Sequence, residues 1–242
     1  QPYSVENQVC HEKAAIIGSG PAGLAAAVFL ARAGVKVTIF EQSEAPGGLL
    51  RYGIPAYRLP RQILEKEIKN IVESYSIDLC CNHKIESAGL DNLRKEYDAV
   101  IAAPGLTQSS IPETWPETPT VKGALELLAA ISRDEPIPGQ DFVIIGGGNA
   151  ALDTARSLKR LGKTVHLIYR RTIDEMPAYP DEIIETQSEG LLLREETVIE
   201  EIIDNGSGLS LNLHRSRKNG NRIEAGDFIE TITTDFLIAA TG

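Results

Sequence analysis

Two short glycine-rich stretches have the residue types and spacing that bind the pyrophosphate of a dinucleotide. The first is Gly18-Ser19-Gly20-Pro21-Ala22-Gly23, and the second is Gly146-Gly147-Gly148-Asn149-Ala150-Ala151. In such a turn, glycine lets the chain leave a strand sharply, lets the backbone approach the phosphates and lets the next helix pack closely. The phosphates then lie at the N-terminal end of that helix, where unpaired N–H groups point at them. Each stretch therefore predicts a dinucleotide site.

The residues that close the two candidate sites differ in charge. Glu41 follows Gly18 by about 20 residues, the separation at which a carboxylate binds the adenosine ribose, and Arg170-Arg171 follows Gly146 at a similar separation. A guanidinium binds a 2′-phosphate through paired hydrogen bonds, whereas a carboxylate would repel it. We therefore expect FAD at the first site and NADPH, in preference to NADH, at the second. The alternatives are a solvated acid and a solvated basic pair at two strand ends.

These turns require a buried strand before them and a helix after them, and the first half of the sequence supplies both. Apolar runs predict strands at 14–18, 35–40, 77–81 and 99–103, and helices at 21–33 and 61–75, with an irregular, turn-rich segment at 43–60. Alternating strands and helices predict a parallel sheet with right-handed crossovers.

The same alternation begins again after residues 111–119, which are rich in Pro, Thr and Glu and are typical of a linker. We expect helices at 124–131, 150–161 and 181–189, a loop at 135–139, and strands at 142–145, 164–169, 228–233 and 236–240. Strand-like runs within 191–216 are separated by the hairpin signal Asn205-Gly206-Ser207-Gly208. The sequence thus predicts an α/β fold with two Rossmann-like dinucleotide-binding domains, residues 1–112 for FAD and 113–242 for NADPH.

Composition excludes several other classes of protein. The 242 residues carry a formal net charge of −10, which argues against a nucleic-acid-binding protein. No apolar stretch is long enough to span a bilayer, and we expect no membrane association. The three cysteines, Cys10, Cys80 and Cys81, form no disulfide framework, metal quartet or Cys-x-x-Cys pair, which excludes dithiol chemistry. We expect a cytoplasmic protein without a secretory signal. Because the sequence does not begin with Met, we also expect a trimmed chain or an excised piece.

Longer motifs carry a family resemblance. Gly47-Gly48-Leu49-Leu50-Arg51-Tyr52-Gly53-Ile54-Pro55-Ala56-Tyr57-Arg58-Leu59-Pro60, and Tyr169-Arg170-Arg171-Thr172 followed by Glu175-Met176-Pro177-Ala178, resemble the signatures of the glutamate synthase small-subunit group. That group includes the flavin half of dihydropyrimidine dehydrogenase and similar NADPH-dependent flavoproteins. The resemblance implies two similar domains, with the NAD(P)H domain inserted into the FAD domain. The alternative for residues 47–60 is an ordinary surface loop.

The resemblance also implies cofactor-binding residues outside the glycine turns. Gly48, Leu49, Arg51 and Arg58 would line the FAD, and Ile54 would lie by its ring. Ala103-Pro104-Gly105 and Ala240-Thr241-Gly242 resemble the two points where the chain crosses between domains close to the cofactors. The full set of predicted cofactor-binding residues is Gly18, Gly20, Pro21, Ala22, Gly23, Glu41, Gln42, Gly48, Leu49, Arg51, Ile54, Arg58, Ala103, Pro104, Gly105, Gly146, Gly147, Gly148, Asn149, Ala150, Arg170, Arg171, Ala240, Thr241 and Gly242.

The sequence departs from this group in three places. It ends at Gly242, before the segment with a Gly-Asp pair that returns to the FAD domain, so we expect a fragment or an FAD site without that segment. It has no N-terminal iron–sulfur domain, because Cys10 alone cannot ligate a cluster. Ala103-Pro104 stands where the group usually has Ala-Thr.

The expected chemistry is transfer of a hydride from NADPH to FAD, followed by transfer of electrons to an iron–sulfur partner. The cofactors carry this chemistry, so we predict no catalytic side chain and no metal site. We expect Asp181 and Glu182 to begin a helix, where acids are favourable. The alternatives are an adrenodoxin reductase-type ferredoxin–NADP reductase and a truncated nucleotide-binding module without turnover.

Overall fold

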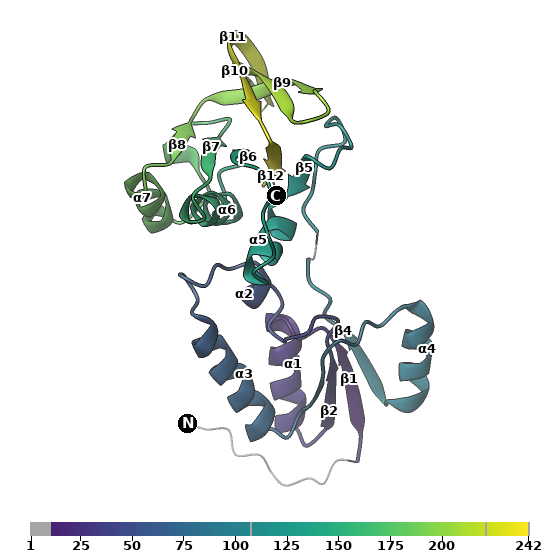
Figure 1. Cartoon of the computed structure of the whole chain (residues 1–242). Coiled ribbons are helices and arrows are strands. Elements are labelled where there is room, and N and C mark those ends of the chain that lie inside the picture. Colours follow the sequence, from purple (N-terminus) through teal and green to yellow (C-terminus); the bar gives the residue numbers. More distant parts are fainter. Residues whose placement is uncertain (1–10, 107, 221, 242) are drawn as a thin grey trace. The chain divides into compact units, whose positions relative to one another are not determined.

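A computed structural model describes residues 11–106, 108–220 and 222–241. The chain divides into two compact units, Gln1–Thr107 and Gln108–Gly242 (Figure 1). Each unit is built on a parallel sheet whose strands alternate with helices, which confirms the α/β class. Cys10 and Gly242, which the sequence analysis singled out, lie outside the described residues.

The first unit contains a four-stranded parallel sheet in the order β3-β2-β1-β4. Its strands are β1 (Lys13–Ile17), β2 (Lys36–Phe40), β3 (Asp78–Cys80) and β4 (Ala99–Ala102). Its main helices are α1 (Pro21–Arg32), α3 (Arg61–Ser74) and α4 (Ser87–Glu96). The strands and the helices α1 and α3 have the positions that the apolar runs predict, within one or two residues.

Apolar side chains cover the two faces of this sheet unequally. On one face, α1 and α3 bury a cluster that includes Leu24, Ile39 and Ile68. On the other face, α4 contributes Leu93 to a smaller cluster with Phe40 (Figure 1). The glycine turn after β1 is therefore held between a well-packed helix and the sheet.

Two short elements of this unit differ from the sequence prediction. Helix α4 was not expected, because Leu93 is the one residue of α4 that is buried and its apolar pattern is too sparse to show a helical period. The segment 43–60 is not wholly irregular, because it contains one helical turn, α2 (Leu49–Tyr52). Cys80 and Cys81 are free.

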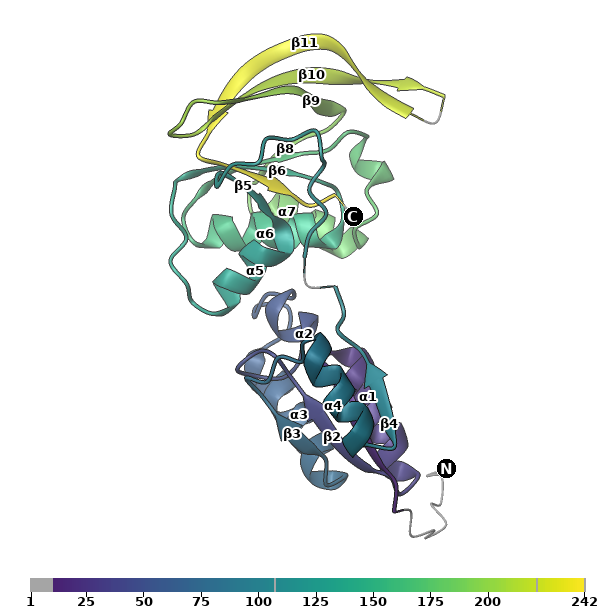
Figure 2. The ribbon, with the colours of Figure 1, turned by 90° about the vertical axis from the view of Figure 1, so that its right-hand side faces the viewer.

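The second unit contains a five-stranded parallel sheet in the order β5-β12-β6-β7-β8. Its strands are β5 (Val121–Gly123), β6 (Asp141–Ile145), β7 (Thr164–Ile168), β8 (Leu192–Arg194) and β12 (Phe236–Ala239). Helices α5 (Ala124–Ser132), α6 (Asn149–Arg160) and α7 (Pro180–Ser188) lie on one face of this sheet (Figure 2). As expected, Asp181 and Glu182 lie in the first turn of α7. Strand β5 was not expected, because three residues are too few to show a period.

A second, antiparallel sheet covers the other face of these strands (Figure 2). It consists of β9 (Thr197–Asp204), β10 (Leu209–Asn219) and β11 (Arg222–Thr234), in the order β11-β10-β9. Leu209, Leu211 and Leu213 alternate along β10 and are buried against residues such as Val143 and Leu237 of the parallel sheet. Strand β11 is much longer than the expected 228–233. The sequence did not predict its full length, because most of the strand is exposed and has no apolar pattern.

Among the described residues, no helix combines the length and the apolar character that crossing a bilayer demands.

Candidate functional site

The first glycine of each turn lies against the backbone of a neighbouring strand end. A Cβ on Gly18, which has φ 101°, would lie 2.3 Å from the carbonyl oxygen of Ala103. A Cβ on Gly146, which has φ 152°, would lie 2.5 Å from the carbonyl oxygen of Ala240. The structure therefore brings each predicted turn together with the predicted crossover residue of its own unit, and both positions require glycine.

The last residue of each turn decides how closely the helix packs. A Cβ on Gly23 would lie 1.9 Å from the carbonyl oxygen of Gly18, so α1 can approach the turn only because this residue is glycine. In the second unit Ala151 takes this position and is fully buried. The start of α6 therefore leaves room for one methyl group where the start of α1 leaves none.

The middle glycines behave differently, because the fold does not require them. A Cβ on Gly148 would have no atom within 4 Å, and the nearest atom to a Cβ on Gly20 would be the Gly48 Cα at 4.0 Å. Neither residue has a positive φ. Open space beside a glycine that the fold does not need is the space that a pyrophosphate occupies in this kind of turn. The residues present thus fit a bound dinucleotide at both turns.

Glu41 closes the first turn and is 5% exposed. Its Oε2 accepts hydrogen bonds from the Ser19 N–H (2.9 Å) and hydroxyl (2.5 Å), and its Oε1 accepts one from the Ser43 N–H (2.8 Å). Burial by itself would raise the pKa of this carboxyl, but the hydrogen bonds from Ser19 and Ser43 together lower it. Glu41 therefore carries a negative charge at neutral pH, and a carboxylate of this kind can accept a hydrogen bond from a ribose hydroxyl.

The segment with the Gly47–Pro60 motif lies directly on the first turn. Gly47 N–H donates to the carbonyl oxygen of Ser19 at 3.2 Å, and the φ of Gly48 is 53°. A Cβ on Gly48 would lie 2.8 Å from the Cα of Gly20, so the two backbones touch. The motif is therefore not an ordinary surface loop, because its backbone forms one wall of the turn.

Arginines fasten this segment in place, and one of them was not predicted. Arg61 donates from Nη1 to the Leu50 carbonyl (3.1 Å) and from Nη2 to the Ile54 carbonyl (2.9 Å). Arg51, a predicted FAD ligand, donates from Nε to the Pro46 carbonyl (2.8 Å) and from Nη1 to a carboxylate oxygen of Glu65 (3.1 Å). Arg61 is the first residue of α3, where the helix dipole disfavours a cation. That unfavourable position could have indicated that Arg61 has partners outside the helix.

In the second unit, Tyr169 takes the position that Glu41 has in the first. Each residue directly follows its strand, and each N–H donates to the next strand of its sheet, Glu41 to Cys80 (2.8 Å) and Tyr169 to Arg194 (2.9 Å). The prediction that Arg170 is equivalent to Glu41 is therefore wrong by one residue, because β7 ends at Ile168. The arginine doublet begins one position farther along the loop.

Tyr169 also explains a glycine that was assigned to the cofactor. A Cβ on Gly147 would lie 2.5 Å from Cε2 of the buried Tyr169 ring, so the ring needs glycine there. The Tyr169 hydroxyl donates to the Glu175 carbonyl at 2.8 Å, and Ala178 N–H donates to the Gly147 carbonyl at 3.3 Å. Tyr169 thus joins the turn to the loop that carries the Met-Pro-Ala motif.

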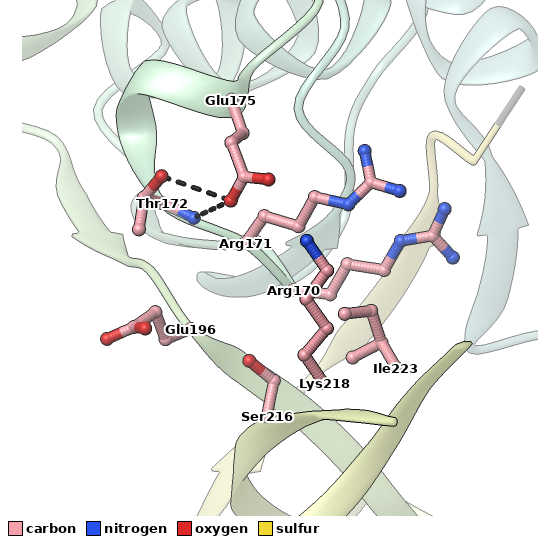
Figure 3. Close-up of a pocket in the computed structure, with 8 residues that line it drawn as sticks. All are labelled: Arg170, Arg171, Thr172, Glu175, Glu196, Ser216, Lys218 and Ile223. Carbon is pink, nitrogen blue, oxygen red and sulfur yellow. Dashed lines mark hydrogen bonds between the residues drawn. The ribbon is translucent and has the colours of Figure 1, made fainter. Parts of the chain in front are cut away.

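Arg170 and Arg171 line a pocket of about 340 Å³. Its lining residues are Arg170, Arg171, Thr172, Glu175, Glu196, Ser216, Lys218 and Ile223 (Figure 3). Figure 3 shows both guanidinium groups extended to the same side, with Lys218 reaching from the hairpin toward them. The fingerprint glycines Gly146–Gly148 do not line this pocket. The pocket combines three cations with two carboxylates, and sequence reasoning found only the doublet.

The remaining predicted residues have varied surroundings. The side chain of Asn149, at the start of α6 with Ala150, accepts a hydrogen bond from Tyr179 N–H at 3.0 Å and so holds the start of α7. Thr241 donates its hydroxyl to the Ser110 carbonyl at 3.4 Å. The residues that are exposed are Pro21, Ala22, Gln42, Leu49, Pro104 and Gly105, and those that are half-buried are Ile54 and Arg58.

A family model described as pyridine nucleotide-disulphide oxidoreductase matches residues 12–242. The chain belongs to this family. Membership identifies an NAD(P)H-dependent flavin oxidoreductase of a family that uses FAD and NADPH, the two cofactors that the sequence predicts. The comparisons assign neither cofactor to a turn or to a residue.

Three relatives within this family support the predicted resemblance. The NADP(+)-dependent formate dehydrogenase subunit beta of Moorella thermoacetica is 43% identical over 75% of this chain and 26% of its own length. The NAD-dependent dihydropyrimidine dehydrogenase subunit PreT of Salmonella typhimurium is 40% identical over 74% of this chain and 44% of its own length. A putative glutamate synthase [NADPH] small chain of Cereibacter sphaeroides is 34% identical over 74% and 46% of the two lengths. The chain thus spans less than half the length of these relatives.

A solved structure gives the same fold. FprA of Mycobacterium tuberculosis in complex with NADPH superposes with a TM-score of 0.75 and 19% identity, over 96% of this chain and 70% of its own. At this identity the similarity shows the fold alone. It confirms the Rossmann-like architecture predicted from the alternating elements.

Proposed function

We propose that this chain is an NADPH-dependent flavin oxidoreductase module of the glutamate synthase small-subunit type. Bound NADPH would supply a hydride, FAD would accept it, and the electrons would pass to an iron–sulfur protein or subunit. The carrying observation is that two turns with the same backbone constraint are followed by side chains of opposite charge, Glu41 directly after its strand in one unit and Arg170-Arg171, just beyond Tyr169, in the other.

Residues 1–112 would bind the FAD. The turn beginning at Gly18 would hold the pyrophosphate against the start of α1, and Glu41 would accept a hydrogen bond from a ribose hydroxyl through its Oε1. The backbone at Gly48 would form the wall that excludes water. Arg58 and Ile54 would complete the surface toward the ring.

Residues 113–242 would bind the NADPH. The turn beginning at Gly146 and the start of α6 would hold its pyrophosphate, while Arg170 and Arg171 would bind its 2′-phosphate. We further propose that this domain is inserted into the FAD domain, as the family resemblance implies. No side-chain acid or base is needed for hydride transfer, so the chain's residues bind and orient the cofactors.

An electron-accepting partner is also part of the proposal. The Moorella and Salmonella relatives are named as subunits, and the Cereibacter relative as a small chain, which supports a role within a larger assembly. An iron–sulfur centre is the chemical class that accepts single electrons from a reduced flavin. The three cysteines of this sequence form no cluster motif, so the acceptor would lie outside these residues.

The flavin spectrum of the purified chain tests this function directly. We expect the chain, mixed with FAD and freed of excess, to be yellow and to lose its flavin absorbance when NADPH is added without oxygen. NADH at the same concentration is the control and should act much more weakly. A colourless chain that still binds NADPH would contradict the proposal and favour the module without turnover.

The variant Arg170→Glu tests the coenzyme assignment separately. It should weaken the binding of NADPH by at least a hundredfold, because it replaces an attraction for the 2′-phosphate with a repulsion. The two changes together are worth about 3 kcal/mol. NADH has no phosphate at this position, so its affinity should change little. Equal losses of the two coenzymes, measured as the concentration that half-reduces the flavin, would refute the assignment.

A further inference from the structure

We infer that the β10–β11 hairpin supplies a third cation, Lys218, to the phosphate pocket and that Lys218 helps to determine the preference for a 2′-phosphorylated coenzyme. This inference rests on the proposed function, because it assigns NADPH to the second unit. It adds a residue from a distant part of the chain, which no motif around the arginine doublet contains.

The geometry of the hairpin directs Lys218 to the pocket. Ser216 and Lys218 are two residues apart on β10, so their side chains lie on the same face of the strand. Ile223 pairs with Lys218 across the hairpin and shares this face. All three side chains line the pocket, whereas Arg217, on the opposite face, does not.

Main-chain hydrogen bonds fix the hairpin to the loop of the arginine doublet. Glu196 N–H donates to the Arg171 carbonyl at 3.0 Å, and Ser216 N–H donates to the Glu196 carbonyl at 2.7 Å. Glu196 has φ 47°, the left-handed conformation that is uncommon for a residue with a side chain. This bend places Glu196 between the two segments, so Lys218 starts from an anchored strand.

The charges of the pocket are left unbalanced inside the protein. Among the described residues, Arg170, Arg171 and Lys218 form no ion pair. Of the two carboxylates of the lining, Glu196 pairs with Arg215 at 3.5 Å, and Glu175 accepts hydrogen bonds from the N–H (3.4 Å) and hydroxyl (3.2 Å) of Thr172, so the lining still carries more positive than negative charge. Three neighbouring cations repel one another, and a dianionic phosphate would relieve that repulsion.

The chemistry of the lining suits a phosphate monoester on a ribose. The guanidinium groups offer planar pairs of donors, the Lys218 ammonium offers a point charge, and the Ser216 hydroxyl offers a neutral donor. A ribose without the phosphate would leave all three cations unpaired. Lys218 therefore contributes to discrimination between the coenzymes and has no role in holding the rest of the nucleotide.

The test measures binding to the full chain by calorimetry, with 2′,5′-ADP and 5′-AMP as probes that differ only in the 2′-phosphate. We expect Lys218→Ala to weaken the binding of 2′,5′-ADP about tenfold, which is the loss for one charge-assisted contact. The affinity for 5′-AMP should not change. The matched control is Arg217→Ala, which removes the same charge from the same strand on the opposite face. It should change neither affinity by more than about twofold.

The outcomes separate this inference from the proposed function. Equal losses in Lys218→Ala and Arg217→Ala would overturn the inference, because general electrostatic attraction would explain both. If Arg170→Ala weakens 2′,5′-ADP while Lys218→Ala does not, the inference falls and the NADPH assignment stands. If neither variant changes the ratio of the two probes, the assignment itself fails. Lys218→Arg should restore most of the affinity, and circular dichroism should show all variants folded.

Discussion

The two glycine turns have the same backbone constraint, but different side chains hold each turn against the end of the neighbouring strand. In the first unit, Ser19 and Glu41 join the turn to the strand end by hydrogen bonds within one buried polar pair. In the second unit, Gly147 and Tyr169 make the same connection by packing a ring against a bare backbone. In both units, the residue directly after the strand holds the turn. Where that residue is aromatic, the charged side chains begin one position farther along the loop, at Arg170.

The helices beside the turns differ in the same way. In the first unit, α1 and α3 meet through apolar side chains such as Leu24 and Ile68. In the second unit, Arg156 of α6 is 2% exposed and contacts Glu182 (2.5 Å) and Glu185 of α7 and Glu189 (2.9 Å), the residue that directly follows α7. Charged groups therefore stabilise the second unit in a place where the first uses hydrophobic burial.

The largest expected effect tests the shared backbone constraint. Gly18→Ala and Gly146→Ala should each lower the free energy of unfolding by about 3 kcal/mol, because the new Cβ would strike a carbonyl oxygen at a backbone conformation already unfavourable to alanine. The control is Gly190→Ala, which has φ 69° and no atom within 4 Å of its Cβ, and which should cost about 1 kcal/mol. Chemical denaturation measures all three. If Gly146→Ala costs no more than the control, the two turns are not equivalent.

The next effect tests the ionic helix pair. Arg156→Met should lower the free energy of unfolding by about 2 kcal/mol, because it removes the buried guanidinium that Glu182, Glu185 and Glu189 share, and partial exposure of the glutamates reduces the loss. Arg160, which also contacts Glu189 but is 46% exposed, provides the control, and Arg160→Met should cost less than about 0.5 kcal/mol. Thermal unfolding gives both values. Equal costs would show that burial of Arg156 is not what matters.

A smaller effect tests the polar pair of the first turn. Glu41→Gln should cost about 1 to 2 kcal/mol at pH 7, because it weakens charge-assisted hydrogen bonds from Ser19 and Ser43. Since the folded pKa of Glu41 is lowered, its contribution is complete above the ordinary value of 4.5 and is lost as pH falls through the lower folded pKa. The difference between Glu41→Gln and the parent chain should therefore shrink below pH 4.5. The exposed neighbour Glu44 is the control, and a Glu44→Gln variant that behaves the same way would contradict this account.

The smallest effect on stability accompanies a large effect on binding. Gly20→Ala and Gly148→Ala should change the free energy of unfolding by no more than about 1 kcal/mol, the scale of a helix N-cap substitution. Each should weaken its own nucleotide more than tenfold, because the new methyl group would occupy the space left for the pyrophosphate. Titration of each variant with FAD and with NADPH distinguishes the two turns. A variant that binds both nucleotides normally would remove that glycine from the site.

Much of this architecture was predictable from the sequence because its signals are local. Buried strands appear as apolar runs, and the turns appear as glycines between a strand and a helix. Helix α4 and strand β5 were not predictable, because the first buries a single leucine and the second has three residues. The sequence could not show that Tyr169, and not Arg170, takes the position of Glu41. That position depends on where β7 ends, and the end of a strand can be located from the sequence only to within a residue or two.

The residues of the candidate site were predictable where they are neighbours within one sequence motif. The arginine doublet was found in this way. Ser216 and Lys218 were not found, because their place in the pocket depends on strand pairing between segments far apart in the sequence. Arg61 was missed for a similar reason, since its two carbonyl partners belong to the preceding loop.

Strand β12 has a mechanical consequence for the second turn. Asp235 separates it from the hairpin strand β11, and the carboxylate of Asp235 accepts hydrogen bonds from the N–H groups of Gln140 (2.6 Å) and Asp141 (3.0 Å). At its other end, the carbonyl of Ala240 rests against Gly146. Close-packed interiors yield little to compression. We therefore expect a displacement of the hairpin to be passed along the four residues of β12 to the backbone beside Gly146.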